Sequence, residues 1–110
     1  MDTKIHFQNL QQKFLNKKFN DILDEGKKLL NKFKKEIFLL NICGLCCYFL
    51  SKNKEAIVYF KKAIEIDKNN FVLKINLANT LTNIGEYKEA EKIYLSAIKK
   101  QPNNPSFLSF

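Results

Sequence analysis

The chain has 110 residues, of which 45% are hydrophobic and ten are phenylalanine, so it can build the core of one domain and is not expected to be disordered. Three glycines and two prolines are too few for many short strands and tight turns, which favours helices. The formal net charge is +8 and every basic residue is lysine, whereas specific readers of DNA and RNA favour the planar fork of arginine, so we do not expect a nucleic-acid partner.

The first two predicted helices lie near residues 3–16 and 19–33. Ile5, Leu10 and Phe14 give the first an apolar face at helical spacing. The second carries a longer apolar stripe, which is formed by Phe19, Ile22, Leu23, Leu29, Leu30 and Phe33.

Four further helices are predicted near residues 36–50, 53–66, 70–84 and 86–100, and they contain an internal repeat. The segment EAIVYFKKAI at 55–64 recurs as EAEKIYLSAI at 89–98, an offset of 34 residues. The same offset carries Asn70 onto Asn104, both of them residues of the N-cap type, and Pro105 suits the first position of a helix. The period divides the chain into units near 3–36, 37–70 and 71–104.

The period and its residues resemble the tetratricopeptide repeat family. The third unit follows the family pattern with Leu77, Ala78, Gly85, Tyr87, Ala90, Tyr94, Ala97 and Pro102. The second unit follows it with Cys43, Gly44, Ala56, Phe60 and Ala63, and has Lys68 where proline is usual. The first unit diverges, as a terminal unit with one face toward solvent does, because Gly26 replaces a large aromatic and Leu29 a small alanine.

The resemblance implies an all-α fold, a right-handed superhelical stack of antiparallel helix pairs, in one domain over residues 1–110. Small side chains are expected to let the helix backbones approach closely, while Phe60 and Tyr94 fill the gaps between them. The small residues are Gly44, Ala56, Ala63, Ala78, Ala90 and Ala97.

A cluster of three cysteines, Cys43, Cys46 and Cys47, is the feature that most resembles a chemical site. A zinc site takes about four ligands from two separated pairs, and the single histidine, His6, lies in another unit. All three cysteines fall at packing positions of the repeat, where cysteine acts as a small buried hydrophobe. We therefore expect no metal, no cofactor and no catalytic residue, and the chain is predicted not to be an enzyme.

The resemblance further implies that the first helix of each unit lines a concave, partner-binding groove. Its exposed positions in the second unit are Phe38, Asn41, Ile42, Leu45, Tyr48 and Phe49. Those in the third unit are Val72, Ile75, Asn76, Asn79, Thr82 and Asn83. The apolar half could receive apolar anchors and the asparagine half could pair with a peptide backbone, whereas packing of the aromatics against the first unit is an equal alternative. No basic residues stand where clamp-type members grip a C-terminal carboxylate.

Residues 105–110 look like the start of an incomplete further unit. The face of Ile93, Leu95 and Ile98 is then expected to be covered by Phe107, Leu108 and Phe110, or by another chain. We expect a fragment of a longer protein in preference to self-association through the C-terminal end.

Together these features predict a protein-protein interaction module, or scaffold, that binds a peptide or a partner protein in its groove. The alternative is the targeting or oligomerising repeat region that precedes the catalytic domain of a glycosyltransferase-like or sulfotransferase-like enzyme. No segment resembles a signal peptide or a membrane span, so a cytoplasmic location is expected. The densest basic cluster is interpreted as a solvated helix face, and consists of Lys27, Lys28, Lys32, Lys34 and Lys35.

Overall fold

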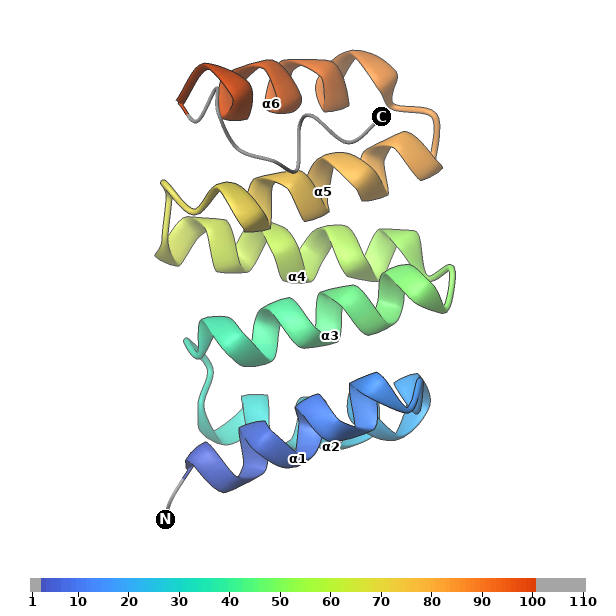
Figure 1. The fold of residues 1–110 in the computed structure, drawn as a ribbon, viewed down its shortest axis with the longest axis vertical. Coiled ribbons are helices and arrows are strands. Elements are labelled where there is room, and N and C mark those ends of the chain that lie inside the picture. The colour runs from blue at the N-terminus through green and yellow to red at the C-terminus, as the bar shows by residue number, and fades with distance from the viewer. Residues whose placement is uncertain (1–2, 101–110) are drawn as a thin grey trace.

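The computed structural model describes residues 3–100, and these form six α-helices and no strand. The helices are α1 (Thr3–Leu15), α2 (Phe19–Lys32), α3 (Ile37–Phe49), α4 (Asn53–Ile66), α5 (Phe71–Asn83) and α6 (Tyr87–Lys100). They stack in chain order, from α1 and α2 at one end to α6 at the other (Figure 1). The predicted all-α stack of helix pairs is confirmed, with each helix end within one residue of its predicted place.

The turn inside each helix pair has the same geometry in all three units. Its central residue has a positive φ, 57° at Lys17, 61° at Ser51 and 84° at Gly85, and these positions are 34 residues apart. The amide of the next residue then donates to a carbonyl in the last turn of the preceding helix, which is the pattern of a Schellman cap. The backbone of the first unit therefore follows the same repeat as that of the other two units.

The turns between units are also equivalent to one another. The amide of Phe33 donates to Leu29 O at 2.8 Å, and the amide of Asp67, 34 residues later, donates to Ala63 O at 3.0 Å. Asn70 caps α5 as predicted, since its side chain accepts from the amide of Leu73 at 3.2 Å. The predicted cap Asn104 and the neighbouring Pro105 lie outside the described residues.

The helices α3 and α4 pack closely against each other. A Cβ atom added at Gly44 would lie 2.6 Å from Cε1 of Phe60, so the ring occupies the space that a side chain would need. Ala56 and Ala63 of α4 are fully buried, and Ala90 and Ala97 of α6 are almost fully buried. The predicted role of the small residues is confirmed.

In the first unit, the close contact between helices is made by different residues. Gly26 lies on α2 where a large aromatic was expected, and a Cβ there would approach Sγ of Cys43 to 2.5 Å. The thiol of Cys43 therefore occupies the space that a side chain at Gly26 would need, and α2 lies close to α3 at this point.

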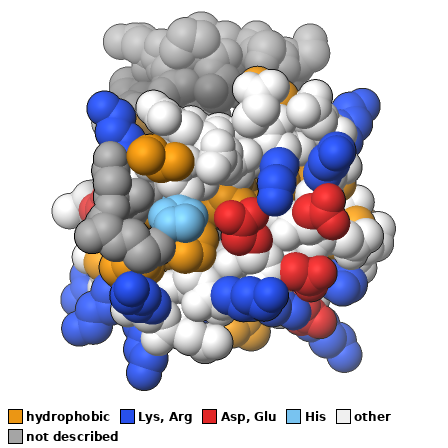
Figure 2. All heavy atoms as spheres, turned by 90° about the horizontal axis from the view of Figure 1, so that it is seen from below, with side chains coloured by type: hydrophobic (Ala, Val, Ile, Leu, Met, Phe, Trp, Pro, Cys, Tyr) orange, Lys and Arg blue, Asp and Glu red, His pale blue; other side chains and the backbone are white. Residues whose placement is uncertain are grey.

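Three buried clusters run along the stack and share one side chain, Leu30, which packs against all of them. At the α1–α2 end, charged side chains of both signs cover much of the surface, as expected for a terminal unit (Figure 2). At the other end Ile93 packs into the core, whereas Leu95 is 57% exposed. Phe107, Leu108 and Phe110 lie outside the described residues. None of the helices within residues 3–100 is long and apolar enough to cross a membrane.

The contact between Gly26 and Cys43 predicts a coupled effect of two substitutions. Gly26→Ala should destabilise the chain, because the new methyl group overlaps the thiol. In a Cys43→Ala background the same change should cost less, by about 1 kcal/mol or more, since the obstacle is gone. Urea unfolding of the four proteins measures this coupling, and equal effects in the two backgrounds would mean that the thiol is not the obstacle.

The positive φ angles predict opposite effects at two equivalent turns. Ser51→Gly should raise the free energy of unfolding by up to about 1 kcal/mol, because glycine adopts this region without steric cost. Gly85→Ser should lower it by a similar amount. Thermal unfolding of the two variants checks the pair, and the account of the turns fails if both variants shift stability in the same direction.

Candidate functional site

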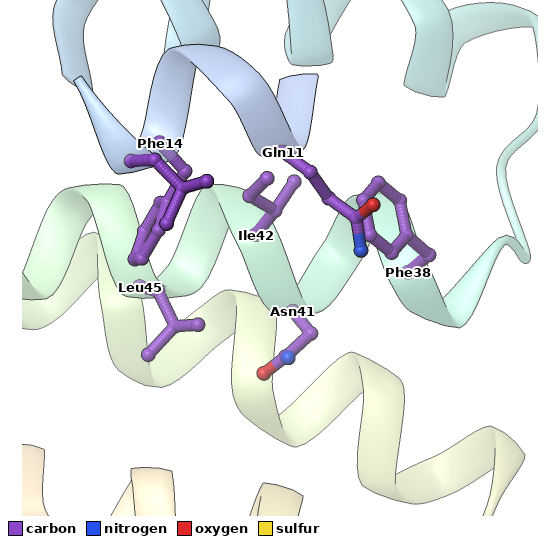
Figure 3. Close-up of a pocket in the computed structure, with 7 residues that line it drawn as sticks. Gln11, Phe14, Phe38, Asn41, Ile42 and Leu45 are labelled. Carbon is purple, nitrogen blue, oxygen red and sulfur yellow. The ribbon is translucent and has the colours of Figure 1, made fainter. Parts of the chain in front are cut away.

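A hollow of ≈ 430 Å³ lies between α1 and α3, on the face that the first helix of each unit forms. It is lined by Gln11, Phe14, Leu15, Phe38, Asn41, Ile42 and Leu45. Figure 3 shows Phe14 and Leu45 at one end, Gln11 beside Phe38 at the other, and Ile42 between them. The hollow is therefore apolar in its middle and carries two amide side chains.

A smaller hollow of ≈ 160 Å³ continues the same face toward α5. Leu45 belongs to both hollows, and the smaller one is also lined by Tyr48, Phe49, Phe60, Asn76 and Asn79. None of the described residues that line the two hollows is charged. We call the two hollows together the groove.

The asparagines of the groove are held by hydrogen bonds within the protein. Nδ2 of Asn76 donates to Oδ1 of Asn41 at 2.9 Å, which ties α5 to α3. The hydroxyl of Tyr94 donates to Oδ1 of Asn79, which ties α6 to α5. These bonds fix the direction in which each amide faces the groove.

Two of the aromatic residues of the predicted site, Phe38 and Phe49, pack against the first unit, as the alternative interpretation required. The ring of Phe38 stacks on Phe7 with centroids 4.5 Å apart. Phe49 stacks on Phe19 at 5.1 Å and meets Phe14 edge-on at 5.9 Å. Phe49 is nevertheless 52% exposed, so it both joins α3 to the first unit and presents apolar surface.

Not all of the residues predicted for the site are exposed or line the groove. Ile42 was expected to be exposed and is only 5% exposed, because it packs in the cluster that contains Leu10 of α1; this expectation was wrong. Val72, Ile75 and Asn83 lie on α5 but do not line either hollow. Asn83 and Val72 are exposed, and Ile75 is half-buried.

Sequence reasoning missed the contribution of α1, which supplies Gln11, Phe14 and Leu15 to the larger hollow. The signal for them is the 34-residue period, because Gln11, Phe14 and Leu15 lie one period before Leu45, Tyr48 and Phe49. The divergence of the first unit from the family pattern makes this correspondence less visible.

The sequence of the chain matches a known protein family. Residues 51–110, more than half of the chain, match the family model described as tetratricopeptide repeat. The chain belongs to the tetratricopeptide repeat family. A comparison with curated proteins finds no match. The family match begins at Ser51, and the equivalent turn at Lys17 extends the same repeat geometry to the first unit.

The three cysteines of this tetratricopeptide repeat chain are all buried and free, which confirms that they pack in the core. Burial raises the pKa of the Cys43 and Cys46 thiols to about 12 and that of Cys47 to about 11. The described residues contain no group of three or more His, Cys, Asp or Glu side chains arranged to hold a metal ion. The thiols are thus placed as protonated, apolar packing groups.

The raised pKa values predict that the native thiols resist alkylation. At pH 9.0, the ordinary pKa of a thiol, a thiol with a pKa of about 12 is ionised to about one part in a thousand, and only the thiolate reacts. Iodoacetamide at that pH should therefore modify Cys43 and Cys46 of the native chain at least about a hundredfold more slowly than in guanidinium.

The same raised pKa values determine how the free energy of unfolding changes with pH. Above pH 9.0 the unfolded thiols lose protons while the native ones keep theirs, so the unfolded state binds fewer protons. This contribution to stability is complete below pH 9.0 and declines as the pH rises toward about 11 for Cys47 and about 12 for Cys43 and Cys46. Rapid modification of the native thiols would contradict their burial.

Proposed function

We propose that the chain is an interaction module that binds a peptide segment of a partner protein along the groove. The observation that carries this proposal is the ≈ 430 Å³ hollow, which combines an apolar middle with amide groups at its edge. Such a combination is typical of sites that take an apolar anchor and orient it through a few polar contacts. Family membership supports a role in protein interaction.

The hydrogen-bonded amide pair supports recognition of a peptide backbone. Because Nδ2 of Asn76 donates to Oδ1 of Asn41, the NH2 group of Asn41 and the side-chain oxygen Oδ1 of Asn76 keep hydrogen-bonding capacity for a ligand. One donor on α3 and one acceptor on α5 match the C=O and N–H groups of an extended chain. The pair is pre-organised, so little side-chain entropy is lost on binding.

The uncharged lining indicates which peptides suit the groove. With no charged side chain on either hollow, binding would depend on apolar anchors and backbone contacts, and only weakly on salt. A C-terminal carboxylate would find no basic partner there. If the chain were instead the repeat region of a larger enzyme, the same groove would present a substrate protein, so the test below bears on both functions.

The test uses peptides selected on the chain itself. A random peptide library displayed on phage is enriched against the wild-type chain, and the affinity of each selected peptide is then measured by fluorescence polarisation. Leu15→Ser removes an apolar side chain that is 75% exposed and lines the larger hollow. Losing the burial of a leucine, worth about 1.5–3 kcal/mol, should weaken binding by about tenfold or more.

Two further variants make this test specific. Val58→Ser is the matched control, because Val58 is an exposed apolar residue on α4 that does not line the groove. Asn41→Asp keeps an acceptor for Nδ2 of Asn76 but removes the free NH2 group, and should weaken binding without unfolding the chain. Equal affinity in wild type, Leu15→Ser and Asn41→Asp would rule out the groove as the binding site.

A further inference from the structure

A second and larger hollow, of ≈ 650 Å³, lies on the face formed by the second helices of the first two units. Its walls come from α2, the connection that follows α2, and α4, and Leu40 of α3 also lines it. It shares no lining residue with the groove. We call it the α2–α4 hollow.

The α2–α4 hollow is strongly basic. Four lysines line it, Lys27, Lys34, Lys35 and Lys62, against a single acidic residue, Glu65. None of these four lysines forms an ion pair with a described residue. The hollow therefore carries an excess of positive charge that can attract an anionic group.

Helix electrostatics explain only part of this arrangement. On α2 the acidic residues Asp21, Asp24 and Glu25 precede the lysines, and cations near the C-terminal end of a helix are favoured by its dipole. That accounts for the place of Lys32 in the last turn of α2, but not for that of Lys27, which lies further from the end of the helix. It does not account for Lys34 and Lys35, which follow the end of α2, or for Lys62, which approaches from α4.

The rest of the lining is mostly apolar, with Leu30, Leu40, Tyr59 and Ile66 beside the amide of Asn31. Ile66, at the end of α4, is 42% exposed, so it offers apolar surface next to positive charge. Burial raises the pKa of Tyr59 to about 12, which keeps its hydroxyl protonated and able to donate to an anionic group.

From this combination we infer that the α2–α4 hollow binds an acidic peptide segment with apolar side chains between its carboxylates. The carboxylates lie against the four lysines and an apolar side chain enters between Tyr59 and Ile66. A nucleic-acid backbone fits less well, because it carries no aliphatic side chain for the apolar part of this surface. This site is separate from the groove and does not depend on the function proposed for it.

The experiment uses a fluorescein-labelled synthetic peptide of alternating Glu and Leu residues and the complete chain. Lys34→Glu with Lys62→Glu reverses charge on both walls of the hollow, and should weaken binding by about tenfold or more. Lys88→Glu with Lys92→Glu makes the same change of net charge on exposed positions of α6, outside the hollow, and should change affinity much less. Circular dichroism verifies that each variant is folded.

Further arms identify the occupant. Ile66→Ala should also weaken binding of the peptide, whereas a peptide with Ser in place of Leu should bind the wild type several-fold more weakly. Leu15→Ser in the groove should leave the affinity for the acidic peptide unchanged, which separates this site from the proposed one.

Three outcomes would overturn the inference. Equal losses in the two double variants would mean that net charge alone attracts the peptide. No effect of Ile66→Ala, with single-stranded oligothymidine binding more tightly than the peptide, would assign the hollow to nucleic acid. Absence of peptide binding at low salt would remove the site altogether.

Discussion

The rest of the stack depends on the close approach of α3 and α4, where the ring of Phe60 lies in the space above Gly44. This contact fixes the register of the central pair, because a side chain at Gly44 would collide with the ring. Each helix of a repeat stack contacts mainly its neighbours, so the central pair sets the position of α2 on one side and α5 on the other. Related contacts lie on both sides of this pair. On α2 the thiol of Cys43 occupies the space beside Gly26, and in the third unit Tyr94 occupies the position of Phe60.

This packing also sets the chemistry of the groove. Tyr94 lies partly buried in the core while its hydroxyl holds Oδ1 of Asn79, so a packing residue of α6 orients a polar residue of α5. Asn41 and Asn76 are likewise held by each other. The groove is thus a by-product of the helix register, and a change in core packing would alter the directions of its amides before it altered their identity.

Much of the fold could be predicted from the sequence because the 34-residue period fixes helix lengths and small-residue positions together. The left-handed turns were visible only at Gly85, since Ser51 and Lys17 adopt the same φ without a residue type that announces it. The burial of Ile42 could not be predicted from its position in the repeat, because it depends on how far Leu10 of the divergent first unit reaches. For the same reason, the sequence left open whether Phe38 and Phe49 belong to the groove or to the packing, and the structure shows that they contribute to both.

Charge is distributed unevenly between the helices of the second and third units. α3 has no charged residue and α5 has only Lys74. The second helices α2, α4 and α6 each have one face toward solvent, and they carry charges of both signs. An uncharged groove and a basic hollow can therefore coexist on one short chain without either disturbing the other. Since long-range attraction acts on the charged face and short-range apolar contact on the groove, salt would change the two interactions to different extents. A partner that carried both an acidic and an apolar segment could then use the two faces together, with an affinity greater than either face supplies alone.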